Sequence, residues 1–303
     1  EISILASQTV VPNGLVDKVS QASTSYSPTV SINEYFSPNI FATYDKSIKD
    51  HNLHATVGFQ SEVNNYYALG ASSDYLISNN IISLNASLDD DQTVTEAISH
   101  WSTVGLFSRF RYNYKEKYLF EFSYRRDGSS RFEPDNRWAG FPSFSAGYNI
   151  AKEEFWPIDA INTFKLRGSY GTLGNQNVDN YLYLSTIELN TGGTSYLFDG
   201  ERLTFSQTPD ISSENLTWEK VKTTDIGFDL SAFNSKLDLG FSWYRTDIEG
   251  MAAQGADLPA QLGTNAPLTN IGTSRVQGWE VETTWRQKLG DFGYSVRAVL
   301  SDY

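Results

Sequence analysis

The sequence predicts an all-β protein, and specifically an antiparallel transmembrane β-barrel made of long strands. Three observations predict this fold: apolar and polar residues alternate with a period of two, short and long connections alternate, and aromatic residues gather beside the short connections. A period of two places successive side chains on opposite faces of a strand. No purely apolar run exceeds four residues. A membrane-spanning helix, which needs about 20 apolar residues, is therefore excluded.

About eleven strands are expected, and many of them supply the 9–11 residues that a tilted membrane-spanning strand requires. In chain order they are 1–9 (with a weak pattern), 29–46, 49–67, 99–115, 117–128, 137–152, 162–173, 216–233, 236–249, 271–288 and 291–303. The apolar stripes that define the clearest of them are Leu53, Ala55, Val57 and Phe59; Tyr118, Phe120, Phe122 and Tyr124; Phe164, Leu166 and Tyr170; Ile226, Phe228 and Leu230; Leu237, Leu239, Phe241 and Trp243; Trp279, Val281 and Trp285; and Tyr294, Val296, Ala298 and Leu300.

The opposite face of the same strands is polar. In a barrel, the apolar face meets lipid and the polar face lines the lumen. The side chains predicted to face the lumen are Glu121, Ser123, Arg125, Lys165, Arg167, Glu280 and Glu282.

The connections alternate in length. Short turns are expected at 115–117, 234–235, around 290–291 and near 49–50, and a connection of intermediate length at 152–161. Long irregular segments are expected at 10–28, 68–98, 129–136, 174–215 and 250–270. Outer-membrane barrels have short periplasmic turns and long extracellular loops, so the long segments are predicted to face outside.

Aromatic residues lie where strands meet the short turns, as in Tyr112, Tyr114 and Tyr118, Phe155 and Trp156, and Phe292 and Tyr294. Amphipathic rings prefer the headgroup level of a bilayer, where they form girdles. Alternation alone also fits a secreted β-sandwich, with the rings packed in its core. The loop asymmetry and the girdles favour the barrel.

Composition excludes several classes of function. The 303 residues include 36 acidic and 23 basic side chains, and the net charge of −13 argues against a nucleic-acid-binding protein. Cysteine is absent, which excludes disulfides and thiolate metal sites. The three histidines form no HExxH pattern, and the nucleophile elbow, phosphate loop and dinucleotide turn are all missing. The chain is predicted not to be an enzyme.

Two long stretches carry a family resemblance. Residues 117–156 are KYLFEFSYRRDGSSRFEPDNRWAGFPSFSAGYNIAKEEFW, and 164–178 are FKLRGSYGTLGNQNV. Together with NLTWEK at 215–220, the hairpin at 225–247 and the NIG and GWEVE segments within 270–282, they resemble the SusC/RagA family of TonB-linked outer-membrane proteins of Bacteroidetes-type bacteria. The resemblance covers most of 99–303 and, weakly, 29–67.

The resemblance implies a TonB-dependent transporter in the bacterial outer membrane. Residues 1–303 would be part of its barrel wall, because the family's carboxypeptidase-like extension, TonB box and plug domain have no counterpart here. About eleven strands is roughly half of the 22 in large plugged transporters. The implied function is import of a bulky oligosaccharide or peptide. The implied partners are a SusD-like lid lipoprotein, membrane lipid and the TonB complex, which would bind through the absent region.

Candidate contact residues for cargo or lid are few. The segment 174–215 carries Tyr181, Tyr183, Tyr196 and Phe198 among amide and hydroxyl residues, which suits sugar stacking or lid docking as well as packing onto the barrel mouth. Arg125 lies in the RRDGSSRF motif, where a structural role is favoured over ligand contact. No cofactor is expected. Asp89, Asp90 and Asp91 are weak candidates for Ca²⁺, but an EF-hand spacing is absent and a solvated acidic loop is favoured.

The sequence also leaves two other classes of function open. One is a non-transporting carbohydrate-binding or adhesion β-sandwich, whose apolar stripes would face a protein core. The other is a passive porin, which differs from the importer in having no plug.

Overall fold

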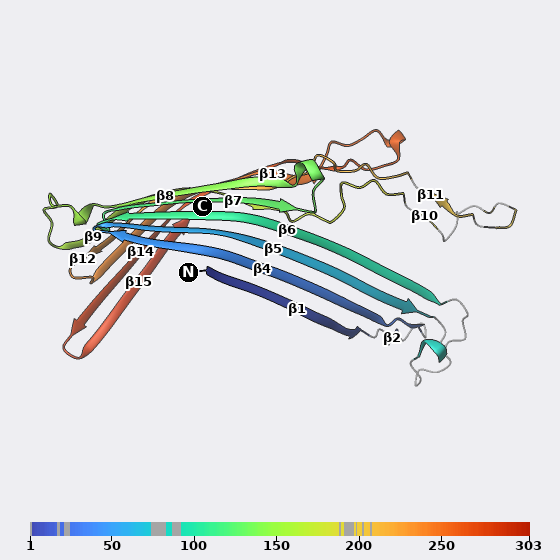
Figure 1. Ribbon diagram of the computed structural model, residues 1–303, viewed down its shortest axis with the longest axis horizontal. Helices are drawn as coiled ribbons and strands as arrows, with labels where there is room; N and C mark the ends of the chain where they lie inside the picture. Colours follow the sequence, from blue (N-terminus) through green and yellow to red (C-terminus); the bar gives the residue numbers. More distant parts are fainter. Residues whose placement is uncertain are drawn as a thin grey trace. The chain divides into compact units, whose positions relative to one another are not determined.

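The computed structural model describes the chain except for residues 1, 17–18, 21–24, 74–82, 87–91, 188, 191–196, 198, 202 and 207. Its main feature is one antiparallel sheet of eleven strands, in the order β1-β4-β5-β6-β7-β8-β9-β12-β13-β14-β15 (Figure 1). The bounds are β1 (Ile2–Val16), β4 (Thr29–Ile48), β5 (His51–Ser72), β6 (Thr93–Tyr114), β7 (Tyr118–Ser129), β8 (Trp138–Asn149), β9 (Ile161–Asn175), β12 (Glu219–Ala232), β13 (Leu237–Gln254), β14 (Leu268–Leu289) and β15 (Phe292–Asp302). The all-β prediction is confirmed.

Small elements occupy the connections. Two separate ladders pair β2 (Val19–Ser20) with β3 (Ser25–Tyr26) and β10 (Leu189–Asn190) with β11 (Phe205–Ser206). Four 3-10 turns are η1 (Leu84–Ala86), η2 (Pro134–Asn136), η3 (Ile150–Lys152) and η4 (Ala260–Leu262). No helix in the described part of the chain is long and apolar enough to cross a membrane.

Some strand bounds differ from the sequence prediction. Residues 150–152 form η3 rather than the end of a strand, and 216–218 precede β12 instead of opening it. β1, β6 and β13 run several residues further than expected. Backbone pairing continues there beyond the alternating segment, because ladder hydrogen bonds do not depend on side-chain type.

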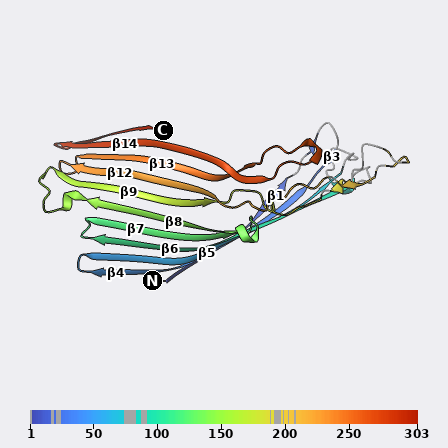
Figure 2. The same ribbon diagram turned by 90° about the horizontal axis from the view of Figure 1, so that it is seen from above.

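The chain divides into two compact units. Unit 1 comprises 1–2, 41–58 and 105–303, and unit 2 comprises 3–40 and 59–104. Within unit 2, a bridge joins Tyr26 to Ser73, and the Asn64 side-chain amide donates to Asn33 Oδ1 at 2.8 Å. Within unit 1, β7, β8, β9, β12, β13 and β14 lie side by side in that order (Figure 2).

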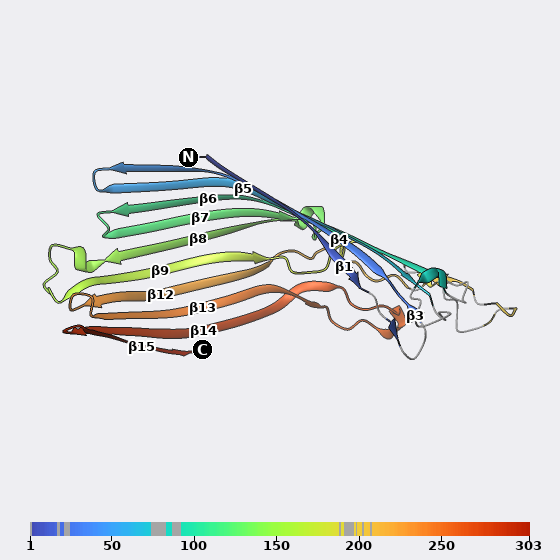
Figure 3. The same ribbon diagram turned by 90° about the horizontal axis from the view of Figure 1, so that it is seen from below.

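The connections of unit 1 keep the alternation that the sequence predicts. The short turns after β4, β6, β12 and β14 and the η3 connection lie at one end, on the left of Figure 3. The connections 130–137, 176–218 and 255–267 begin and end at the opposite ends of the same strands. The turn between β6 and β7 has three residues, 115–117, of which Lys115 and Glu116 have positive φ, near 52° and 54°, and Lys117 N donates to Tyr114 O at 2.9 Å.

The register confirms that the sheet has one apolar and one polar face. Directly opposed residues in an antiparallel pair share a face. One row running across seven strands is Tyr118, Tyr148, Leu166, Phe228, Phe241, Val281 and Leu300. A parallel row on the other face is Glu121, Ser145, Ser169, Asp225 and Tyr244. The sequence-predicted stripes therefore join into continuous bands.

The apolar band is exposed in this chain. Phe120 is 43%, Ile226 57% and Leu300 64% exposed. The buried apolar residues of the described chain are Ala68, Phe132, Phe141, Leu216, Trp218 and Ala232. A sandwich would bury such a band between two sheets, and a soluble chain of this length would have a far larger core. The exposed band therefore fits a surface covered by lipid.

Spin labels on neighbouring residues test the assignment of the faces. A label at Phe122 is expected to collide with oxygen dissolved in lipid, and a label at Ser123 with a water-soluble quencher. The physical reason is that the register places the two residues on opposite faces. Accessibility of position 123 to oxygen alone would mean that the polar face does not line an aqueous lumen.

Candidate functional site

Charged side chains on the polar face cross-link neighbouring strands of unit 1. Arg167 on β9 reaches over β12: its Nη1 donates to Asp225 at 2.6 Å, its Nε to Asp229 at 3.4 Å, and its Nη2 to Ser242 Oγ on β13 at 2.5 Å. Gly227 lies directly opposite Arg167, and a Cβ there would come within 3.0 Å of the guanidinium carbon. The glycine therefore leaves the space in which the arginine spans three strands.

Arg125 is engaged by its own strand. Its Nε donates to both carboxylate oxygens of Asp127, at 2.8 and 2.7 Å, and its guanidinium lies 6.0 Å from the centre of the Phe107 ring. A Cβ on Gly105 would be 2.3 Å from Asp127 Oδ1. The pair thus fills space that the glycine provides, and the role of Arg125 toward a ligand or partner stays a prediction.

Glu280 and Glu282 lie on β14 and line a groove of about 430 Å³ with Asp229 and Asp238. Glu282 forms an ion pair with Arg297 at 2.7 Å, and Asp238 forms one with Arg286. Within the described residues, no group of three or more metal-ligating side chains is arranged to hold a metal ion.

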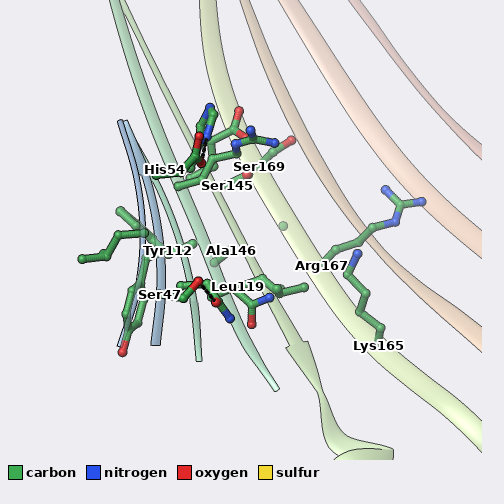
Figure 4. Close-up of a pocket in the computed structure, with 18 of the residues that line it drawn as sticks. Ser47, His54, Tyr112, Leu119, Ser145, Ala146, Lys165, Arg167 and Ser169 are labelled. Carbon is green, nitrogen blue, oxygen red and sulfur yellow. Dashed lines mark hydrogen bonds and ion pairs between the residues drawn. The ribbon is translucent and has the colours of Figure 1, made fainter. Parts of the chain in front are cut away.

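A larger groove of about 520 Å³ crosses the polar face near the short turns, and all of its lining residues belong to unit 1. Three of the predicted lumen-facing residues, Glu121, Lys165 and Arg167, line it. Figure 4 shows Lys165 and Arg167 projecting from the same strand, β9. Ser123 shares the polar face with Ser143 directly opposite. We call this hollow the β5–β9 groove; its lining also includes Asp45 of β4 and Asp225 of β12.

A small core fixes the roots of the loops at the other end of unit 1. This loop-root core consists of Phe132, Phe141, Leu216 and Trp218, with Trp218 5.5 Å from Phe132 and 5.6 Å from Phe141 between ring centres. Trp218 Nε1 donates to Arg137 O at 2.7 Å. Residues 132, 141, 216 and 218 all lie in the stretches that carry the family resemblance, so those stretches hold the long loops on the wall.

Asn270 joins two of these loop roots. Its Oδ1 accepts from Thr217 N at 2.8 Å, and its Nδ2 donates to Thr217 O at 2.9 Å and to Gly250 O at 2.6 Å. The register of β13 with β14 shifts beside Gly250, where a bulge disturbs regular pairing. The asparagine side chain supplies the hydrogen bonds that regular pairing would otherwise provide.

The structure describes only some of the residues that the sequence predicts to contact cargo or lid. Tyr181 and Tyr183 are half-buried, and the intervening Leu182 packs against the loop-root core. Tyr196 and Phe198 lie outside the described residues, as do Asp89, Asp90 and Asp91. The roles in cargo, lid or Ca²⁺ binding stay predictions.

A belt of rings borders the short turns. Tyr118 stacks on Tyr148 with ring centres 5.1 Å apart, and Tyr114 lies 6.2 Å from Tyr118. Glu153 in the turn after β8 accepts hydrogen bonds from Lys117 Nζ at 3.0 Å and Tyr118 OH at 2.8 Å. The hydrogen bond from Lys117, and after it the one from Tyr118, holds the pKa of Glu153 below its usual range. The belt matches the aromatic girdle that the sequence predicts.

Comparisons with known proteins agree with this architecture. Residues 8–303 match the family model described as TonB dependent receptor-like, beta-barrel. TonB-dependent receptor P3 of Formosa agariphila is 31% identical over 262 residues, which cover 84% of this chain and 25% of the relative. TonB-dependent receptor SusC of Bacteroides thetaiotaomicron is 34% identical over 180 residues, 58% of this chain and 18% of SusC. Both organisms are Bacteroidetes.

Solved structures show the same fold. The RagAB peptide transporter superposes with a TM-score of 0.78 at 22% identity, over 98% of this chain and 34% of that one. The siderophore receptor PiuA from Acinetobacter baumannii gives 0.52 at 13% identity over 98% of this chain.

The chain spans about 25% of the length of the curated relative P3. β1 and β15 stand at opposite ends of the strand order. The match to the family model extends over nearly the whole chain, from residue 8 to residue 303. The chain therefore belongs to the TonB-dependent receptor β-barrel family, a family of outer-membrane receptors and transporters rather than enzymes.

Proposed function

We propose that this chain forms part of the wall of a SusC-type importer, which moves a bulky oligosaccharide or peptide across the outer membrane. A SusD-like surface lipoprotein serves as its lid, and the TonB complex supplies energy through a part of the protein outside residues 1–303. The family match over 8–303, with SusC among the relatives, is the observation that carries the proposal.

The two faces of the sheet support a transport role. A continuous apolar band suits contact with lipid, while the polar face offers ion pairs and grooves to an aqueous path. The loop-root core includes Leu216 and Trp218, at the end of the segment 176–218, and lies at the end of the strands opposite the short turns. Recognition by long loops on a rigid scaffold is a common arrangement.

Uptake in cells tests the proposal. The full-length protein is expressed in a Bacteroidetes host, and periplasmic accumulation of fluorescent oligosaccharides and peptides too large for porins is measured with and without a functional TonB. We expect accumulation of one cargo class to require both TonB and the neighbouring lid lipoprotein. Accumulation that persists without TonB would instead indicate a passive porin. Surface binding without accumulation would indicate an adhesin.

Labelling of intact cells tests the orientation of the wall. Cysteine is absent from the chain, so Ser235→Cys and Ala256→Cys each introduce a single thiol. Both positions are exposed, Ser235 in the short turn after β12 and Ala256 in the long segment after β13. We expect a membrane-impermeant thiol reagent to label Ala256→Cys but not Ser235→Cys, because long loops face outside. The reverse pattern would invert the orientation.

A further inference from the structure

The β5–β9 groove contains more positive charge than its carboxylates neutralise. Its three carboxylates are all engaged. Asp45 pairs with His54 at 2.5 Å, Glu121 with Arg109 at 2.9 Å, and Asp225 with Arg167 at 2.6 Å. Two of these acids, Glu121 and Asp225, are thus neutralised by an arginine, and Asp45 is hydrogen-bonded to His54.

Three strong cations on the lining have no ion-pair or hydrogen-bond partner among the residues that the structure describes: Lys46 of β4, Arg111 of β6 and Lys165 of β9. Arg111 and Lys165 stand on either side of β7 and β8 in the strand order. The chain as a whole carries a net charge of −13, so positive charge without a carboxylate beside it is unusual in this molecule. A cation on a wall of low dielectric attracts anions more strongly than the same cation in open water.

Hydroxyl donors accompany Arg111 and Lys165. Ser145 of β8 and Ser169 of β9 lie directly opposite each other on the polar face, and both line the groove (Figure 4). A guanidinium offers a planar pair of donors that matches the two oxygens of a carboxylate or sulfate, and an ammonium adds a compact charge. The groove, with about 520 Å³, is large enough for a monosaccharide unit or a short peptide end.

We propose that the β5–β9 groove is an anion subsite, in which Arg111 and Lys165 bind carboxylate or sulfate groups of the cargo and Ser145 and Ser169 offer further hydroxyl donors. This inference rests on the proposed import function and narrows its substrate class to cargo that bears an oxyanion. The groove lies near the short turns, which are proposed to face the periplasm. The subsite would therefore hold cargo late in its passage through the barrel. The oxyanion is shared by acidic oligosaccharides and acidic peptides.

Equilibrium binding to the purified full-length protein in detergent tests the subsite without requiring transport. The probes are a trisaccharide of uronic acids, its neutral hexose counterpart, an acidic tripeptide, its amidated counterpart, and free sulfate. The variants are Arg111→Gln, Lys165→Gln and the double variant. Lys288→Gln is the matched control, because Lys288 is an exposed cation on the polar face of β14 and does not line the groove.

We expect one acidic probe to bind more tightly than its neutral counterpart. Each substitution should weaken that binding about tenfold, because losing one hydrogen bond to a charged group lowers affinity by roughly that factor. Added salt should weaken it too, and Lys288→Gln should leave it unchanged. The acidic probe that binds identifies the cargo source, and binding of sulfate alone would reduce the groove to a site for free anions and overturn the proposal.

The remaining outcomes separate this inference from the import function. Equal binding of acidic and neutral probes, or loss of binding in Lys288→Gln as large as in Arg111→Gln, overturns the subsite. TonB-dependent uptake of neutral cargo alongside either result leaves the import function intact. Binding of an acidic probe that responds to Arg111 and Lys165, without any uptake in cells, supports the subsite and contradicts the import function.

Discussion

Replacing Trp218 with alanine should lower the free energy of unfolding by about 3–5 kcal/mol, the range for deleting a large buried aromatic side chain. Trp218 is 6% exposed and packs against Phe132 and Phe141. Its loss removes apolar contact, leaves a cavity and deletes the hydrogen bond to Arg137 O. The measurement is a urea titration of the full-length protein folded into lipid vesicles.

The matched control is Trp138→Ala. Trp138 is 49% exposed and lies on the apolar face, where its ring faces the Arg126 guanidinium. Lipid can fill the space that this substitution leaves, so its cost should be clearly smaller. Limited proteolysis of folded vesicles adds a second measurement, because loss of the loop-root core should expose 176–218 to cleavage. Equal costs together with an uncleaved loop would show that the core does not hold the loop roots.

Phe241→Arg should destabilise the wall by about 2–4 kcal/mol if the site lies near the bilayer midplane. Phe241 lies in the apolar row between Phe228 and Val281. An arginine there would place a charge in hydrocarbon. The same vesicle titration measures the change.

An adjacent residue provides the control. Gly240→Arg places the same side chain one residue away, on the polar face, directly between Asp229 and Glu282. A Cβ there meets only Asp229 Oδ1, at 4.0 Å, so the side chain has room and two carboxylates beside it. Its cost should be small. A cost similar to that of Phe241→Arg would mean that the two faces do not differ in their surroundings.

Asp238→Arg is a poorer control for this comparison than the sequence suggests. The sequence places Asp238 on the polar face, where a charge change should cost little unless it breaks a lumenal pair. The structure pairs Asp238 with Arg286 across β13 and β14. Substitution there therefore mixes the loss of an ion pair with the effect of the face.

The order and faces of the strands could be predicted from the sequence because each strand carries its own period-two pattern. The row from Tyr118 to Leu300 follows once consecutive strands pair, as they do in a meander. Residues 216–218 could not be placed in the same way. Leu216 and Trp218 continue the apolar alternation of 216–233, but they turn into the loop-root core, and burial against Phe132 outweighs strand pairing.

The candidate site was only partly predictable. Period two assigns Lys165 and Arg167 to the polar face, but it cannot show which one finds a carboxylate. Arg167 reaches Asp225 because Gly227 leaves room, whereas Lys165 lies opposite Asn149 and Asp229 without an ion pair among the described residues. The β5–β9 groove depends on the registers of several strands at once. No local pattern encodes that combination.

The three hydrogen bonds of Asn270 have a consequence for how such a protein can diversify. They tie Thr217, near the end of the long segment 176–218, to Asn270 of β14, which also holds Gly250 inside β13. Changes of length or composition within 176–216 need not disturb the register of the strands, and loop closure becomes only slowly more costly as a loop grows. Anchored by one side chain at its end, the loop can therefore change in evolution while the strands of the wall keep their sequence.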